Sequence, residues 1–292
     1  MKKIIFSITV IIFISSNAFN KNEEKLIDNV DPFIGSGGHG HVFVGANVPF
    51  GGVQVGPTNF NKGWDWSSSY HHTDSIVKGF CHINVSGTGM SDLGELTIMP
   101  ATGELKTGAG TQDNHMAGYS SLYRKNKEFA SVGYYKVHLE RYDIDVELTA
   151  TERVGFHKYI FPKANKSRVI IDLGEGSADR PTETYIKKVN DTLYEGHRFS
   201  TGWAKDQREY FSLITSKPIS EFIIYDRHKK FKGVERKGDY VKGFLEFSTS
   251  EDEKIMVKMG ISTVSSKNAL ENMMIELPHW DFEKVKSDAE QK

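Results

Sequence analysis

Alternation of apolar and polar side chains is the clearest pattern in the middle of the chain. From Tyr142 to Leu148 the apolar residues alternate with acidic ones, and Tyr135 to Leu139 alternates in the same way. Successive side chains of a strand point to opposite faces of a sheet, so this pattern predicts strands with one buried and one solvated face. Further strand-like segments follow at short spacing: residues 155–161, 168–173, 210–215, 221–225, 241–247 and 255–261.

Polar turn sequences separate these segments, and the pattern changes near the C-terminus. Turn signals lie at residues 162–165, 190–191, 236–239 and 250–253. Many short strands without intervening helices favour an all-β fold of the β-sandwich type. Residues from Ser265 to Glu276 have a helical composition that begins with a capping serine, and Asp281 to Lys292 again favours a helix. We therefore expect a β-sandwich with a short C-terminal helical linker segment.

The first residues have the pattern of a secretory signal peptide. Lys2 and Lys3 precede an almost wholly apolar run from Ile4 to Ile14, and small residues follow at Ser16 to Ala18. This apolar run is too short for a comfortable membrane span, so we expect a cleaved signal at residues 1–18 rather than a membrane anchor. The mature protein, with an N-terminal extension over residues 19–29, is then expected to be periplasmic or secreted.

Charge and cysteine content exclude some functional classes. The chain carries 37 Lys and Arg residues against 38 Asp and Glu residues, which gives no electrostatic basis for binding nucleic acid. Cys81 is the only cysteine, so no intrachain disulfide can form and the fold must depend on its apolar core. Aromatic residues at 12% and 27 glycines suit a protein of strands and turns whose ligand has flat apolar faces, as sugars do.

Candidate binding residues are concentrated between Val30 and Pro100. Two glycine-rich loops, at residues 37–41 and 86–89, flank a Trp-Asp-Trp sequence and a His-His-x-Asp sequence within residues 64–74. Glycine allows the backbone to approach a ligand closely, and indole rings stack on sugar CH groups. We expect residues 37–41 and 64–74 to adjoin at one end of the sandwich. The candidate substrate-binding residues are Gly37, Gly38, His39, Trp64, Asp65 and His71.

Other chemistry remains open from the residues alone. His39, His41 and His71 are possible metal ligands, although Gly40 implies a turn between the first two. Glycoside hydrolysis usually needs two carboxyl groups, but the sequence does not place any two at the required separation. The available carboxyl groups are those of Asp65, Asp74, Asp92 and Glu95, and turn capping is an alternative role for Asp65 and Asp74.

Several blocks closely resemble glycoside hydrolase family 92. They are VDPFIGSGGHGH at residues 30–41, ANVPFGGVQVGP at 46–57, GWDWSSSYHHTD at 63–74, VKGFCHINVSGTGMSDLGEL at 77–96 and MGISTVSSKNA at 259–269. The resemblance runs from about Val30 to the end of the chain. Ser67, His72 and Asn84 stand where the family usually has Cys, Tyr and His, and these departures concern linkage specificity more than fold.

The resemblance implies a division of labour between two domains. Members are calcium-dependent, inverting exo-α-mannosidases, mostly of the α-1,2 type, in which a supersandwich-like β-sandwich is joined to an (α/α)6 barrel. The barrel supplies the general acid, the general base and most Ca2+ ligands, and the sandwich supplies loops around the mannose. By this resemblance, residues 30–263 are the sandwich and 264–292 the linker to an absent catalytic barrel. The chain alone is then expected to be inactive, with α-mannoside glycans and the barrel as its partners.

Two other functions compete with this interpretation. One is a stand-alone carbohydrate-binding sandwich without catalytic activity. The other is a metal-dependent enzyme that uses His39, His41 and His71, for which the histidine nitrogens would have to converge on one point.

Overall fold

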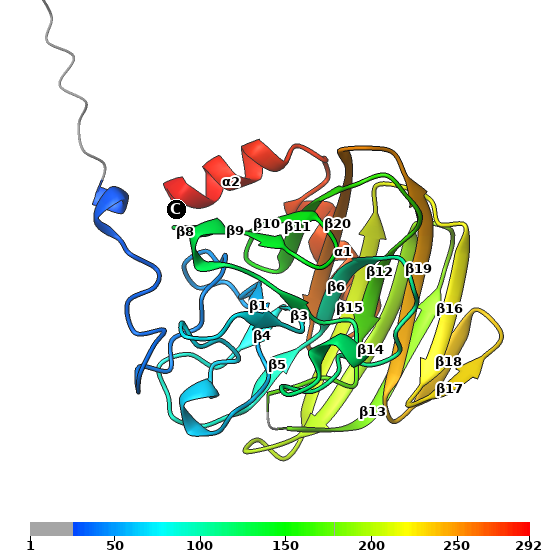
Figure 1. Ribbon diagram of the computed structural model, residues 1–292, viewed down its shortest axis with the longest axis horizontal. Helices are drawn as coiled ribbons and strands as arrows, with labels where there is room; N and C mark the ends of the chain where they lie inside the picture. Colours follow the sequence, from blue (N-terminus) through cyan, green and yellow to red (C-terminus); the bar gives the residue numbers. More distant parts are fainter. Residues whose placement is uncertain (1–25, 178) are drawn as a thin grey trace, which may run out of the picture.

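The computed structural model describes residues 26–177 and 179–292, and the predicted signal peptide lies outside this part. Two large antiparallel sheets pack against each other, which confirms the predicted all-β fold (Figure 1). The first sheet has seven strands in the order β1 (Gly56–Thr58), β3 (Gly79–Cys81), β6 (Thr97–Thr102), β12 (Ala164–Asp172), β19 (Val241–Thr249), β16 (Glu221–Asp226) and β17 (Lys229–Phe231).

The second sheet has nine strands. Their order is β18 (Glu235–Gly238), β13 (Arg180–Lys188), β14 (Leu193–Thr201), β15 (Gln207–Thr215), β20 (Glu253–Ser262), β11 (Val154–Phe161), β10 (Ile144–Ala150), β9 (Tyr134–Leu139) and β8 (Glu128–Ser131). Two small ribbons pair β2 (Ile76–Val77) with β7 (Ser121–Leu122) and β4 (Ile83–Asn84) with β5 (Leu93–Glu95). Short 3-10 turns are η1 (Leu26–Asn29), η2 (Trp64–Trp66), η3 (His115–Ala117) and η4 (Lys125–Lys127).

Strand β10 shows how the alternating pattern produces the core. Ile144, Val146 and Leu148 are fully buried in the main apolar cluster, whereas Asp145 and Glu147 point to the other face and are only half-buried. The sequence pattern placed the start of this strand at Tyr142, two residues too early. Residue 143 has a φ of 52°, so the chain turns there before the strand begins.

Four strands of the nine-stranded sheet, β8, β13, β14 and β18, were not predicted from the sequence. In β14 every second residue is buried, but the buried set includes Gly196, Arg198 and Ser200. The hydrophobic alternation is therefore hidden, because polar side chains occupy inward-facing positions. The predicted turn at residues 236–239 was also wrong for its first three residues, which belong to the edge strand β18.

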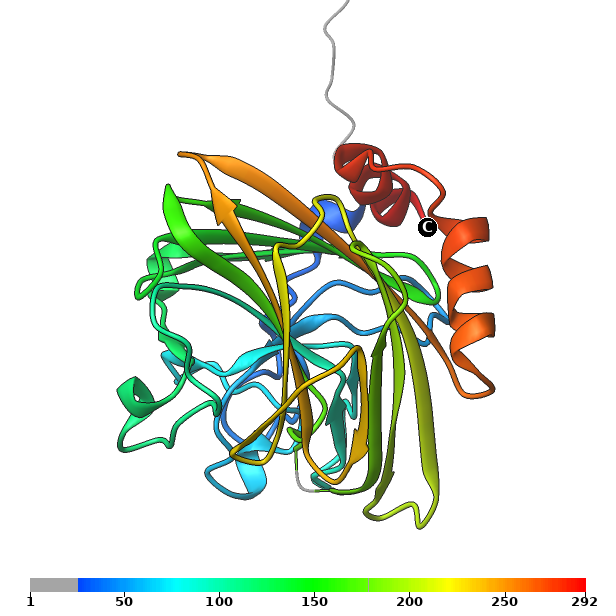
Figure 2. The ribbon, with the colours of Figure 1, turned by 90° about the vertical axis from the view of Figure 1, so that its right-hand side faces the viewer.

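Two C-terminal helices cover part of the outer face of the nine-stranded sheet, α1 (Ser266–Glu276) and α2 (Phe282–Gln291) (Figure 2). The first residues of the two predicted segments, Ser265 and Asp281, are the N-caps of these helices. Ser265 accepts a hydrogen bond from the Asn268 amide and Asp281 from the Lys284 amide. A second apolar cluster joins helices and sheet: Tyr134, Val154, Phe156, Met273, Leu277, Phe282 and Val285.

A buried lysine lies at the end of α1. The Lys258 ammonium group donates a hydrogen bond to the Leu277 carbonyl over 2.9 Å and lies 4.0 Å from the centre of the Trp280 ring. Burial lowers the pKa of Lys258 to about 8. A cation at this position neutralises the negative end of the helix dipole and binds α1 to strand β20.

Candidate functional site

The loop at residues 35–41 forms the tight turn that its glycines predicted. The amide of Gly40 donates to the Gly37 carbonyl over 3.3 Å, and the chain then turns sharply at His41, whose φ is 54°. Gly40 lies directly against the backbone of Gly35, so a side chain at Gly40 would collide with it. His39 is left exposed on the outer side of the turn, while His41 points inward and is buried.

The Trp64-Asp65-Trp66 segment forms the 3-10 turn η2 and is not extended. The turn begins at Gly63, whose φ is 116° and whose amide donates a hydrogen bond to Asn61 Oδ1 over 2.8 Å. In a 3-10 helix, residues two apart do not share a face. Accordingly, Trp64 is 57% exposed, whereas Trp66 packs inward.

The two loops adjoin, as predicted. His39 Nδ1 donates a hydrogen bond to Asp65 Oδ1 over 2.6 Å, and the His41 ring meets the Trp64 ring edge-on with 4.2 Å between centres. The hydrogen bond from His39 holds the pKa of Asp65 below its usual value. The result is a surface that combines an exposed indole, an ionised carboxylate and an imidazole. Binding of a substrate by these residues stays a prediction.

His71 lies beneath this surface, together with Trp66. The two rings stack with 4.2 Å between their centres, and His71 Nε2 donates to the Gly38 carbonyl over 3.3 Å. Trp66 Nε1 in turn donates to Asp74 over 3.0 Å. In this geometry His71 holds the glycine-rich loop in place from the interior.

Three of the four candidate carboxyl groups are buried and paired within the protein. Asp74 caps the following backbone amides and contacts Lys62, while Asp92 accepts a hydrogen bond from Gln207 Nε2 over 2.8 Å. Glu95 is fully buried beside Arg198, 2.7 Å from its guanidinium group. Of the four, only Asp65 reaches the surface loop described above, so no pair of free carboxyl groups flanks a reacting bond here.

Arg198 is the centre of a buried polar network that the sequence did not reveal. Its guanidinium group lies 2.5 Å from Asp179 and also contacts Glu95, whose second neighbour is the hydroxyl of Ser200 at 2.7 Å. Burial raises the pKa of Glu95 to about 8, because the nearby Arg198 only partly offsets the loss of solvent. Glu95 lies 105 residues before Ser200 in the sequence, and no short motif indicates their contact.

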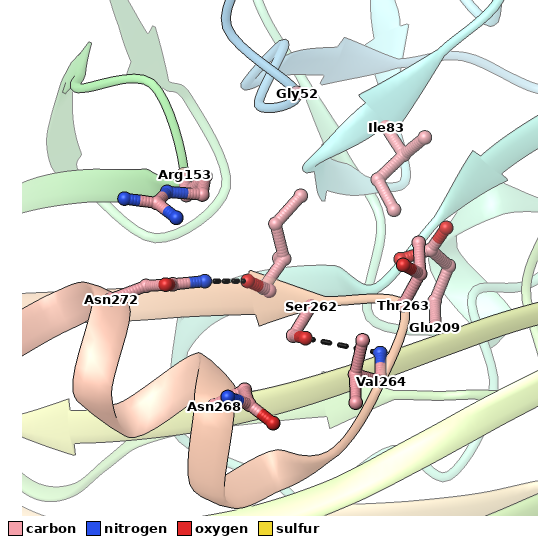
Figure 3. Close-up of a pocket in the computed structure, with 10 residues that line it drawn as sticks. Gly52, Ile83, Arg153, Glu209, Ser262, Thr263, Val264, Asn268 and Asn272 are labelled. Atoms are coloured by element: carbon pink, nitrogen blue, oxygen red, sulfur yellow. Dashed lines mark hydrogen bonds between the residues drawn. The ribbon is translucent and has the colours of Figure 1, made fainter.

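A cavity of about 390 Å³ lies elsewhere, between the start of α1 and strands β4, β15 and β20 (Figure 3). None of the predicted binding residues lines it. Its walls include Ile83, Arg153, Asn272 and Glu209, and burial raises the pKa of Glu209 to about 7. Glu209 directly precedes the strand predicted at residues 210–215, and no motif marks it in the sequence.

No cluster of metal-ligating side chains is present among the described residues. Within residues 26–177 and 179–292, no group of three or more His, Cys, Asp or Glu side chains is arranged to hold one. His39 and His41 face Asp65 whereas His71 faces Gly38, so the three histidines do not converge. We therefore assign no chemical step to Ca2+ in this part of the protein. No helix in the same two ranges is long and apolar enough to cross a membrane.

Solved structures similar to this chain include a family GH92 alpha-mannosidase from Bacteroides thetaiotaomicron. It has 32% sequence identity and a TM-score of 0.88 over 92% of this chain. A family GH92 inverting mannosidase from the same species has 22% identity and a TM-score of 0.76, again over 92% of this chain, and it supports the fold alone. The chain spans about 36% of the length of each of these proteins.

Sequence comparisons agree with the structural ones. An uncharacterized secreted glycosidase of the fungus Arthroderma benhamiae is 24% identical over 92% of this chain, which spans 37% of that protein. The family model of the glycosyl hydrolase family 92 N-terminal domain matches residues 29–262, which includes both loops of the candidate site and both large sheets. The chain therefore belongs to glycosyl hydrolase family 92, and the matched residues form its N-terminal domain.

Proposed function

We propose that this chain is the N-terminal domain of an exported, inverting α-mannosidase of the α-1,2 type. In this proposal His39, Trp64 and Asp65 form one wall of the pocket that holds the terminal mannose, and Gly37, Gly38 and His71 shape that wall. The observation that carries the proposal is the exposed Trp64 beside an ionised carboxylate and an imidazole, without a second free carboxyl group among the four candidates. Such a surface orients a sugar ring but does not by itself break a glycosidic bond.

The catalytic steps are then carried out by residues outside the described part. Inverting hydrolysis needs a general acid at the leaving oxygen and a general base that activates water on the opposite face of the sugar. Ca2+, when bound by that other part, would stabilise a distorted mannose ring. The residues described here contribute binding, orientation and exclusion of water. Export is supported by the basic and apolar pattern of residues 2–14 and by the description of the fungal relative as secreted.

The indole of Trp64 provides the test. Stacking of a ring on an aromatic face contributes about 1–3 kcal/mol, by analogy with base stacking, so Trp64→Ala in the full-length enzyme should lower kcat/KM roughly 10- to 100-fold. Phe129→Ala is a matched control, because Phe129 is also an exposed aromatic residue (54%) but lies on β8, outside the loop cluster.

Three further results would contradict parts of the proposal. If Trp64→Ala lowers the melting temperature strongly while the remaining folded protein keeps its kcat/KM, Trp64 is structural. If purified residues 26–292 hydrolyse an α-mannoside, the catalytic residues lie in this chain after all. Tight mannoside binding by the same fragment, with no activity in the full-length protein, would instead favour a carbohydrate-binding module.

A further inference from the structure

A second exposed indole stands at the tip of the β14–β15 hairpin. Trp203 is 75% exposed, and the residues that follow it, Lys205 and Asp206, are exposed as well. The Gly202 amide donates to the Ala204 carbonyl over 2.9 Å and closes the turn around the tryptophan. An indole held out in solvent between polar side chains offers a ligand both a flat apolar face and an N–H donor.

The hairpin tip is fixed from below by Asp92. The Asp92 Oδ2 atom accepts hydrogen bonds from Gln207 Nε2 over 2.8 Å and from the Ala204 amide over 3.4 Å. Gly202 packs so closely on the same carboxylate that a β-carbon at Gly202 would overlap Asp92 Oδ1. Trp203 is therefore presented by a turn whose two sides are both anchored to one buried side chain.

The Arg198 network supports this arrangement. Arg198 and Ser200 lie on the β14 side of the hairpin, and Arg198 contacts both Glu95 from β5 and Asp179 from the segment that precedes β13. Buried ion pairs of this kind contribute little net stability, and a role in fixing one conformation accounts better for their presence. Here the ion pairs of Arg198 fix the β14–β15 hairpin to the segment that carries Asp92.

The same segment leads directly to Trp64. Gly89 packs against the Trp64 indole, which would overlap a β-carbon at that position, and Asp92 follows three residues later, at most about 11 Å away. Ser177 provides a second connection, because its amide donates to Leu93 O over 2.7 Å and its carbonyl accepts from Asn61 Nδ2 over 3.0 Å. In both ribbon views, turn η2 and the β14–β15 hairpin lie at the same lower end of the molecule (Figures 1 and 2).

We infer that Trp203 is a second carbohydrate-contact residue, which stacks on a further sugar ring of the glycan whose terminal mannose lies at Trp64. The indole would bind the apolar CH face of that ring, and Lys205 and Asp206 offer charged groups to its hydroxyls. This inference rests on the proposed function and extends it, since it makes the enzyme selective for longer or branched mannosides over disaccharides.

The test compares a branched oligomannoside with an α-1,2-mannobiose in the full-length enzyme. Trp203→Ala should lower kcat/KM for the branched substrate roughly 5- to 50-fold and leave that for the disaccharide within about twofold. Trp203→Tyr should restore a large part of the loss, because a tyrosine ring also stacks. The melting temperature should not change, since the side chain is exposed. Phe129→Ala again serves as the control.

Two other outcomes of this comparison contradict the inference. Equal losses on both substrates would show that Trp203 packs against another part of the enzyme, and no loss on either would show that it does not contact the glycan. If the wild type hydrolyses no mannoside at all, the proposed function fails, but the inference remains testable on residues 26–292. Titration with the branched oligomannoside should shift the tryptophan emission of the wild type, and a shift that persists unchanged in Trp203→Ala would refute the contact.

Discussion

We expect the protein to lose stability between pH 7 and pH 5, because it contains a pair of buried histidines. The Nε2 atoms of His82 and His157 lie 2.9 Å apart, and both side chains are inaccessible to solvent. His82 Nδ1 donates to the Leu96 carbonyl over 2.7 Å, and the Tyr159 hydroxyl donates to His157 Nδ1 over 2.8 Å. His157 Nε2 then donates to His82 Nε2, so the chain of hydrogen bonds is complete only when both rings are neutral.

The magnitude follows from the pKa shifts. Burial lowers the pKa of His82 from 6.5 to about 4, and burial together with the neighbouring His82 lowers the pKa of His157 well below 6.5. The unfolded chain therefore binds more protons than the folded protein below pH 6.5. The stabilisation is complete above that pH and is lost as the pH falls towards 4. Between pH 7 and pH 5 each histidine lowers the free energy of unfolding by about 2 kcal/mol, or about 4 kcal/mol for the pair.

Urea unfolding at pH 7, 6 and 5 measures this effect. His82→Asn combined with His157→Gln keeps amide hydrogen-bonding groups in place but removes both titrating rings. The double variant will be less stable at pH 7, but its free energy of unfolding should fall by about 4 kcal/mol less than that of the wild type on going to pH 5. An identical pH dependence in the two proteins would refute the reasoning, because the carboxylates, which also titrate, are common to both.

Three further predictions concern single side chains. Arg198→Met leaves the buried Asp179 without its counter-ion and should lower the free energy of unfolding by about 3–5 kcal/mol, measured in urea at pH 7. A loss below about 1 kcal/mol would mean that the network is dispensable. Gly89→Ala should displace the Trp64 indole, seen as a changed tryptophan emission and a lower kcat/KM with little change in melting temperature. Burial raises the pKa of Cys81 to about 11, so native protein should not react with a thiol reagent at pH 8, whereas unfolded protein should.

The sequence was sufficient to predict the fold class, because the apolar face of strands such as β10 carries few polar residues. It was also sufficient to predict that the loops around His39 and Trp64 adjoin. The internal geometry of the site was not predictable in the same way. Whether Trp64 and Trp66 share a face depends on the 3-10 turn that begins at Gly63, and the sequence was equally compatible with an extended segment.

Long-range polar contacts were the second feature that could not be predicted from the sequence. Asp92 and Glu95 appeared in the sequence as possible catalytic carboxyl groups, and only the fold shows that they meet Gln207 and Arg198 in the interior. The distances between them along the chain exceed 100 residues, and neither partner belongs to a recognisable motif. The same cause hid strand β14, since a buried Arg198 looks like a solvated residue until its partners are known.

The apolar cluster under the two C-terminal helices shows that the folded domain extends beyond the residues that match the family. The family match ends at residue 262, but Met273, Leu277 and Phe282 supply a large part of the cluster that covers Phe156. A fragment cut at residue 262 would leave this strip of the sheet open to water and deprive Lys258 of the Leu277 carbonyl. Such a fragment should aggregate, whereas one that extends through α2 should remain monodisperse, so experiments on this domain should include residues 263–292.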